Sequence, residues 1–166
     1  IQERGGLYER KIYVYKLKTM KDAFDKDGNL LPDEYRICKV GSFLRRFSID
    51  ELPQLFNVLK GDMSMIGPRP LMISTVESMP KQYRRRSSVL PGITGLAQVN
   101  GRNNLKYSVK YSFDIEYVDN ISFWLDLKII FLTVFAVLFA DDSTKYTDVQ
   151  GLDDVGGVDH DPRVKK

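Results

Sequence analysis

At 166 residues, of which 43% are hydrophobic, the chain is long enough for one domain with a buried core and too short for two comfortable ones. A single cysteine, Cys38, excludes an internal disulfide framework, and a single histidine, His160, argues against metal sites and triads built on histidine. The formal charge of +3 hides an acidic stretch at 141–166 and a remainder of about +6, an excess that attracts nucleic acid, anionic lipid or nucleotide phosphates.

The N-terminal residues predict a small β-hairpin. Residues 11–17 are β-branched and aromatic, and Gly5-Gly6 can turn the chain back to a first strand. The stretch 22–34 is rich in Asp, Asn, Gly and Pro and predicts a loop, in which Asp25-Lys26-Asp27-Gly28 lacks the remaining spacing of a calcium site. Because the chain begins at Ile1 with neither a methionine nor a hydrophobic run, we expect it to be a piece of a longer protein.

The middle of the chain predicts short helices separated by turns. Apolar residues recur every three or four positions from Val40 to Lys60, with a break near Ser48, which favours two short helices over one. Residues 71–90 can hold another helix, which ends before the turn that Pro91-Gly92 forces. Residues 92–102 are typical of a loop and a short strand.

The most apolar segment runs from Ile121 to Ala140 and is about as long as a bilayer span. Asp126 and Lys128 interrupt it, and its charge-free part is only twelve residues long, so we expect an interfacial or half-buried helix with Trp124 at the headgroup level. An ordinary core helix is the alternative. Residues 141–166 are acidic and rich in glycine, which predicts a mobile tail behind a domain spanning 1–140.

These segments together predict one α+β domain, mainly helical, with a small β-hairpin and amphipathic helices along a membrane-facing side. The single cysteine suits a reducing compartment, so cytoplasmic chemistry is the default expectation. The sequence does not reveal whether the protein forms oligomers.

Two adjacent carboxylates stand where a helix is expected to begin. Pro53 fits the first helical turn, which places Asp50 at or near the cap, and Ser48 with Glu51 also matches a capping box. Such acids are commonly no more than caps, worth about 1–2 kcal/mol. The same position offers amide protons to a phosphate and keeps a carboxylate ionised. Because adjacent helical side chains point about 100° apart, we expect that the two acids cannot address the same atom, so that one attacks a phosphate while the other holds a metal.

Several basic residues are candidates for binding phosphate beside the two acids. Arg69 stands between two prolines, which restrict its backbone and suit bidentate phosphate binding, although such a turn can be purely structural. A hairpin could bring Lys18 and Arg4 to one end, but surface charges of this kind are usually only solvated. Further candidates for binding phosphate are Arg45, Arg46 and Arg102, which could equally be solvated surface charges. The run Arg84-Arg85-Arg86 favours contact with anionic headgroups, or only with water.

In their order along the chain, these segments resemble the bacterial sugar transferases, the monotopic phosphoglycosyl transferases that start glycan assembly on polyprenyl phosphate. The resemblance covers nearly all of residues 1–138, and several long blocks in the right order are far more specific than one short motif. The matching blocks are Gln2-x-Arg4-x-Gly6, Lys16-Leu17-Lys18-Thr19-Met20, Val40-Gly41-x-Phe43-Leu44-Arg45-Arg46, most of 48–64, Gly67-Pro68-Arg69-Pro70, Pro91-Gly92-Ile93-Thr94-Gly95, Gln98-Val99-Asn100-Gly101-Arg102, Tyr117-Val118-Asp119-Asn120 and Leu125-Asp126-Leu127-Lys128.

The resemblance implies a two-step transfer. Asp50 would attack the β-phosphate of a UDP-sugar and release UMP, leaving a phosphosugar-aspartate that polyprenyl (undecaprenyl) phosphate then attacks. Glu51 would be the ligand of Mg²⁺, Arg69 would steady the phosphates, and Pro91 and Gly92 would lie near the nucleotide. The expected place is the cytoplasmic face of the bacterial inner membrane, at the first membrane step in building an exopolysaccharide, an O-antigen or a glycoprotein. Which sugar is transferred does not follow from the sequence.

The chain departs from the family pattern at its start and in the nucleotide loop. Family members carry an apolar N-terminal membrane segment, and they usually have a basic residue and often a tryptophan where this chain has Leu90 and Leu96. Two other functions suit the same residues: a soluble Mg²⁺-dependent pyrophosphatase that cleaves nucleotide sugars with water, and a non-catalytic scaffold on the membrane surface. No recognised motif accompanies the positive charge, so nucleic acid is not expected as a partner.

Overall fold

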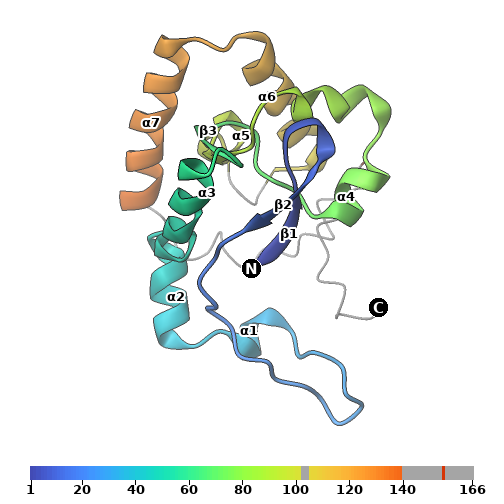
Figure 1. The fold of residues 1–166 in the computed structure, drawn as a ribbon. Helices are drawn as coiled ribbons and strands as arrows, with labels where there is room; N and C mark the ends of the chain where they lie inside the picture. The colour runs from blue at the N-terminus through green and yellow to red at the C-terminus, as the bar shows by residue number, and fades with distance from the viewer. Residues whose placement is uncertain (102–104, 140–154, 156–166) are drawn as a thin grey trace.

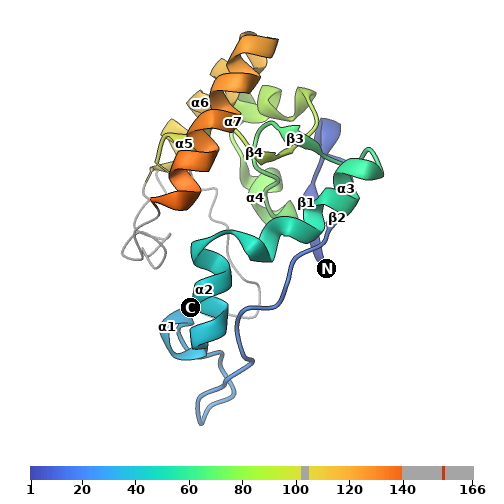
Figure 2. The same ribbon diagram turned by 90° about the vertical axis from the view of Figure 1, so that its left-hand side faces the viewer.

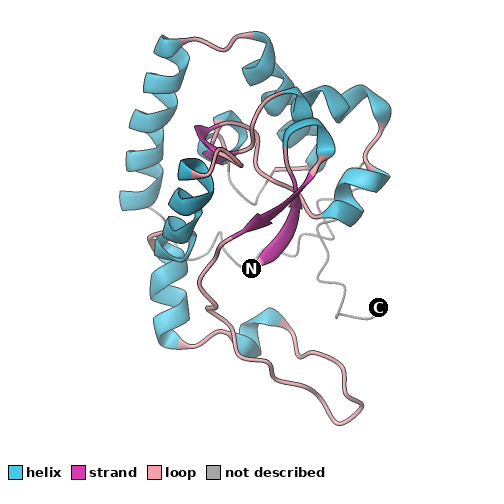
Figure 3. Cartoon of the chain, in the orientation of Figure 1, coloured by secondary structure: helices cyan, strands magenta, loops and turns pink. Residues whose placement is uncertain are grey.

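The computed structural model describes residues 1–101, 105–139 and 155 of the chain. Over these residues the fold is α+β and mainly helical, with two small two-stranded sheets, which confirms the fold class expected from the sequence (Figures 1 and 3). The predicted tail at 141–166 lies outside the described residues, apart from Val155, which packs against one of the hydrophobic clusters.

The predicted hairpin is present at the N-terminus. Strands β1 (Gln2–Gly5) and β2 (Lys11–Val14) pair antiparallel, and a 3-10 turn, η1 (Leu7–Glu9), joins them. The second strand ends at Val14 rather than at residue 17, because Val14 pairs with Gln2 near the beginning of the chain. The chain continues beyond Val14 toward the acidic pair instead of along β1.

A long loop and two helices form the lower end of the molecule in Figures 1 and 2. The predicted loop is confirmed, and its Asp25 carboxylate accepts hydrogen bonds from the backbone N–H groups of Asp27 and Asn29, at 2.9 and 2.8 Å, as in an Asx turn. Helices α1 (Asp33–Arg36) and α2 (Lys39–Arg46) follow this loop.

The break expected near Ser48 separates α2 from a 3-10 segment, η2 (Ile49–Gln54), which continues into α3 (Leu55–Leu59). Ser48 adopts a left-handed backbone with φ 55°, a conformation uncommon for a residue with a side chain. Its side chain makes no capping hydrogen bond, so the capping-box interpretation is wrong. The Glu51 side chain turns toward two cations instead of capping η2.

The segment from 64 to 99 alternates short strands and helices. Strand β3 (Ser64–Ile66) pairs parallel with β4 (Gly92–Thr94), and α4 (Ile73–Ser78), 3-10 segment η3 (Lys81–Ser88) and α5 (Leu96–Val99) complete it. The single helix expected over 71–90 is wrong, because Pro80 pushes the preceding Met79 into an extended conformation with ψ 131°.

Two longer helices, α6 (Tyr107–Asp119) and α7 (Phe123–Leu138), are the last elements along the described part of the chain. Ile129 of α7 is fully buried in a cluster with Ile66, Leu96 and Tyr117, while much of the remaining surface of α7 is exposed. The expectation of a half-buried helix is therefore confirmed. In the described part of the chain, no helix is long and apolar enough to cross a membrane.

Candidate active site

The extended chain after β2 carries Lys16 onto the acidic pair. Asn57 of α3 is fully buried, and its amide holds this segment by accepting from the Tyr15 N–H at 3.0 Å and donating to the Tyr13 carbonyl at 2.7 Å. On the other side of Lys16, the Leu17 N–H donates to the backbone carbonyl of Asp50 at 3.0 Å. Lys16 is thus fixed between two anchors, one on α3 and one on η2.

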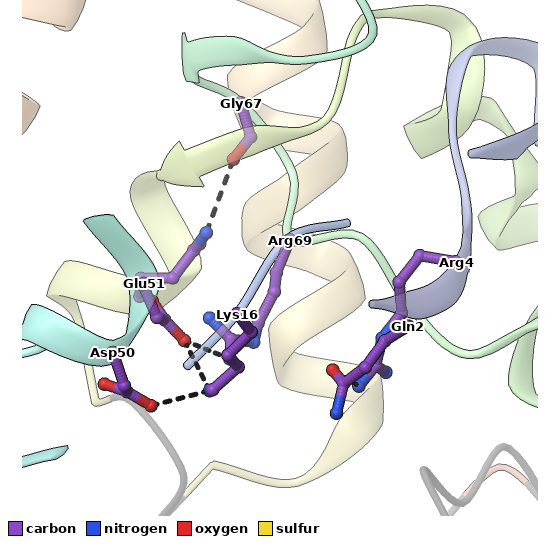
Figure 4. Close-up of polar contacts among 8 residues, drawn as sticks. Gln2, Arg4, Lys16, Asp50, Glu51, Gly67 and Arg69 are labelled. Carbon is purple, nitrogen blue, oxygen red and sulfur yellow. Dashed lines mark hydrogen bonds and ion pairs between the residues drawn. The ribbon is translucent and has the colours of Figure 1, made fainter. Parts of the chain in front are cut away.

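The ammonium of Lys16 lies between the two adjacent carboxylates (Figure 4). Its Nζ is 3.1 Å from Asp50 Oδ2 and 3.1 Å from Glu51 Oε1. The Nη2 of Arg69 approaches the same Glu51 oxygen at 2.8 Å. The two acids therefore share one cation, and Glu51 has a second one of its own.

The two cations hold Glu51 in its ionised form. Burial alone would raise the pKa of Glu51, but attraction from Arg69 and Lys16, together with hydrogen bonds from both, lowers it from 4.5 to about 2. The site therefore offers a charged carboxylate and positive groups side by side at neutral pH. Such a combination suits binding of a phosphate together with a metal ion.

The loop that carries Arg69 is supported by the beginning of strand β4. The Gly92 N–H donates to the Pro68 carbonyl at 2.9 Å, and a Cβ on Gly92 would lie only 2.1 Å from the backbone nitrogen of Gly67. Glycine at position 92 thus permits the close approach of the two segments. Pro91 and Gly92 are both buried, and their predicted contact with the nucleotide stays a prediction.

A pocket of about 30 Å³ opens beside Glu51. It is lined by Gln2, Arg4, Val14, Lys16, Glu51, Gln54, Arg69 and Pro70. This space is large enough for a water molecule or a bare ion and far too small for a nucleotide sugar, which would have to lie across its mouth. Asp50 is only 3% exposed and lies behind Lys16, outside this lining.

The structure brings some of the predicted cations to the site and leaves others elsewhere. Arg4 lines the pocket, where its Nη2 donates to the side chain of Gln2 at 2.9 Å. Lys18 is exposed and pairs with Asp22, at 2.5 Å, so it does not contact the acids. Arg45 is not among the lining residues of the pocket, and Arg102 lies outside the described residues.

Lys16 is a site residue that the sequence interpretation missed, although it opens one of the blocks that resemble the family. Gln54 is another, because its buried side chain lines the pocket beside Glu51. The interpretation of Arg84-Arg85-Arg86 as a solvated or lipid-facing run is wrong for Arg86, whereas Arg84 and Arg85 are exposed. Each of the three arginines pairs with an acid of the protein, and Arg86 is buried.

The two acids fit a magnesium ion as a partial set of ligands. Within the described residues, no three Asp, Glu, His or Cys side chains gather as a metal site. Even so, Asp50 and Glu51 direct one oxygen each at a single position, which a cation, the Lys16 ammonium, occupies. The expectation that the two acids cannot address the same atom is therefore wrong, because the Lys16 side chain places its ammonium within reach of both. Mg²⁺ is commonly held by one or two carboxylates, with water and substrate phosphates supplying the other oxygens.

The chain belongs to the bacterial sugar transferase family, whose model matches residues 1–140. It is 52% identical over 140 residues to the uncharacterized sugar transferase EpsL of Bacillus subtilis (strain 168), covering 84% of this chain and 69% of EpsL. It is 49% identical over 151 residues to the galactosyl transferase CpsE of Streptococcus agalactiae serotype III, covering 82% of this chain and 34% of CpsE.

A third relative is the UDP-glucose:undecaprenyl-phosphate glucose-1-phosphate transferase of Klebsiella pneumoniae, which is 45% identical over 144 residues. That match covers 81% of this chain and 31% of the relative. The chain therefore spans most of EpsL and about a third of the other two proteins. The resemblance found in the sequence is confirmed, and the chain is a member of a family of transferases.

Proposed function

We propose that the protein transfers a sugar 1-phosphate from a UDP-sugar to polyprenyl phosphate, giving polyprenyl diphosphate-sugar and UMP. Relatives from Klebsiella pneumoniae and Salmonella typhimurium are named for transfer of this kind onto undecaprenyl phosphate. The observation that carries the proposal is the pair of acids with Lys16 between them and Arg69 at one side. These groups can neutralise a diphosphate and present a carboxylate to it.

Asp50 is the nucleophile in this proposal. One of its carboxylate oxygens bonds to the β-phosphorus of the donor while the bond from that phosphorus to the bridging oxygen breaks, and UMP leaves with the electron pair. An oxygen of polyprenyl phosphate then attacks the same phosphorus, and the Asp50 carboxylate is released. The covalent step divides a transfer between two anions into two displacements, so the nucleotide and the lipid need not occupy the site together.

Lys16 controls access to the Asp50 oxygen. Because Asp50 Oδ2 is buried against the Lys16 ammonium, its attack requires that this ammonium be drawn aside. The donor phosphates compete for Lys16 and Arg69, which couples binding of the donor to release of the nucleophile. Glu51 would hold Mg²⁺, and that ion would supply further neutralisation of charge on the phosphates.

The proposal also places the protein against the cytoplasmic surface of the bacterial inner membrane, where its lipid acceptor resides. Helix α7 runs along the left-hand side of the molecule in Figure 1, the side that faces the viewer in Figure 2. Large apolar side chains are exposed on it, among them Phe123, Trp124 and Phe131, which are 73%, 75% and 62% exposed. An exposed apolar and aromatic helix of this kind suits the headgroup boundary of a bilayer.

The proposed function is tested by UMP release from UDP-glucose and UDP-galactose in the presence of Mg²⁺ and undecaprenyl phosphate. We expect release that depends on the lipid, and a fall of more than about 10³-fold in the Asp50→Asn variant, because the attacking oxygen is lost. Asp27→Asn, in the exposed loop, is the matched control and should match the wild-type rate. Equal turnover without lipid would indicate the hydrolytic alternative instead.

A further inference from the structure

A buried arginine links helix α6 to the loop that carries Arg69. Arg86 of η3 is only 4% exposed. Its Nε donates to Asp114 Oδ2 on α6 at 2.8 Å, and its Nη2 donates to the backbone carbonyl of Arg69 at 2.7 Å. Its guanidinium also lies 5.6 Å from the ring centroid of Tyr111. One side chain therefore joins an acid, an aromatic ring and the active-site loop.

The buried ion pair between Arg86 and Asp114 is not readily explained by a contribution to folding stability. Asp114 is 3% exposed, and burial raises its pKa even though Arg86 and Lys110 attract the ionised form. Asp114 Oδ1 is also buried without a hydrogen-bond partner among the described residues. Buried ion pairs can often be replaced by well-packed apolar side chains without loss of stability. A positional role would account for keeping the charges.

The loop around Arg69 needs support from outside itself. Its two prolines have no N–H to donate. The Gly67 N–H donates to the Thr94 carbonyl at 2.9 Å, and other support comes from contacts made to the carbonyl groups of the loop. The Pro68 carbonyl accepts from Gly92, and the Arg69 carbonyl accepts from Arg86. The Arg69 side chain is 47% exposed and reaches Glu51 at 2.8 Å. Because about half of that side chain is exposed, its direction depends in part on the backbone from which it projects.

We infer that Arg86, held by Asp114, is a positioning residue for the transfer reaction: it fixes the Arg69 carbonyl so that the Arg69 guanidinium stays beside Glu51, where the donor phosphates bind. The inference rests on the proposed function, since the position of Arg69 affects the reaction only if phosphates bind at this site. Displacement of a substrate-binding group by about 1 Å can cost about 10²-fold in rate.

The variant that separates positioning from structure replaces both charges at once. Arg86→Met with Asp114→Leu keeps much of the buried volume and leaves no unpaired charge, so the protein is expected to fold with nearly unchanged thermal stability. Arg85→Met is the matched control, because Arg85 is exposed and pairs with Asp119. Arg86→Lys is the conservative variant: a single ammonium cannot reproduce the planar fork that joins Asp114 to the loop.

The kinetic test measures UMP release with UDP-glucose and UDP-galactose. We expect kcat/KM of the double variant to fall by about 10–100-fold, mostly through kcat, with Arg85→Met unchanged and Arg86→Lys in between. In an Arg69→Ala background, the same double substitution should change the rate by less than about twofold, because nothing is left to position. Equal losses in both backgrounds would overturn the inference.

A second measurement needs no turnover. In ¹⁵N NMR spectra, the Arg69 guanidinium should give sharp, slowly exchanging signals in the wild-type protein and in Arg85→Met, and should lose them in the double variant and in Arg86→Lys. Unchanged Arg69 signals in any folded variant at position 86 would overturn the inference. A wild-type protein that transfers no sugar phosphate would refute the proposed function, while these spectra would still decide whether Arg86 positions Arg69.

Discussion

Replacing Lys16 by methionine removes the ammonium that the two adjacent acids share. The Nζ of Lys16 is 3.1 Å from Asp50 Oδ2 and 3.1 Å from Glu51 Oε1, and Arg69 Nη2 is 2.8 Å from the same Glu51 oxygen. We expect the pKa of Glu51 to rise in Lys16→Met, because one of the two cations that favour its ionised form is gone. Methionine retains an unbranched apolar stem, so the change is mainly one of charge.

The size of this effect follows from the pKa of Glu51. Burial would raise that pKa, yet Arg69 and Lys16 lower it from 4.5 to about 2. Each pKa unit corresponds to about 1.4 kcal/mol, so ionised Glu51 contributes about 3 kcal/mol to the free energy of unfolding. Because the folded-state pKa is the lower one, this contribution is present above pH 4.5 and is lost as the pH falls toward 2.

The assay compares the free energy of unfolding in urea, with EDTA present, for the wild type, Glu51→Gln, Lys16→Met and the variant with both changes. At pH 7, Glu51→Gln should cost about 3 kcal/mol in the wild-type background and about 1–2 kcal/mol less in the Lys16→Met background, if the two cations share the stabilisation. The four proteins form a double-mutant cycle, in which the cost in unfolding free energy of leaving Asp50 without the Lys16 ammonium cancels. Lys18→Met is the control, because Lys18 pairs with Asp22 instead.

Two results would refute this reasoning. In the first, Glu51→Gln costs the same at pH 7 whether or not Lys16 is present, which would mean that Lys16 does not act on Glu51. In the second, the cost of Glu51→Gln stays constant as the pH is lowered from 7 to 3. The expected direction is a loss of the advantage of glutamate at low pH, because below pH 4.5 the unfolded state binds a proton at Glu51 that the folded state does not bind until the pH nears 2.

Three further predictions concern the supports of the site. Gly92→Ala would put a Cβ 2.1 Å from a backbone nitrogen of the facing loop, so about 3 kcal/mol of stability should be lost in urea unfolding; wild-type stability would contradict that close approach. Asn57→Leu removes both hydrogen bonds that hold the extended segment carrying Lys16, so calorimetry should show a loss of about 2–4 kcal/mol, and UMP release should be slower. Tyr117→Phe removes a 2.9 Å bond to Asp126 and should cost about 1–2 kcal/mol, equally at pH 6 and pH 8, because burial and Asp126 raise the pKa of this tyrosine above 10.

The sequence was sufficient to predict the hairpin, the break at Ser48 and the placement of the two acids just after it. These features depend on local signals: alternating β-branched residues, a proline that tolerates only the first helical turn, and a change of period. The choice between Lys16 and Lys18 depends on tertiary structure. Alternation in an extended chain puts both lysines on one face. Which of them contacts the acids depends on where η2 lies against the extended segment after β2. That position is fixed by the hydrogen bonds from Asn57 to Tyr13 and Tyr15, which are more than 40 residues away in the sequence.

The burial of Arg86 could not be predicted either, because it also depends on a contact between residues far apart in the sequence. Three consecutive arginines usually indicate a solvated surface, and nothing beside them in the sequence contradicts this. The partner that makes burial tolerable, Asp114, is 28 residues further along the chain, on another helix. The parallel pairing of β3 with β4 was missed as well, since three-residue strands carry too little pattern to recognise.

The central claim, that the Asp50 carboxylate carries the sugar phosphate, is tested most directly by mass spectrometry of the protein after brief exposure to UDP-galactose or UDP-glucose and Mg²⁺ without lipid. We predict a gain of one hexose phosphate on the peptide that contains Asp50, removed when undecaprenyl phosphate is added and absent from Asp50→Asn. Lipid-dependent transfer with no adduct on that peptide, or with full activity in Asp50→Asn, would contradict the claim.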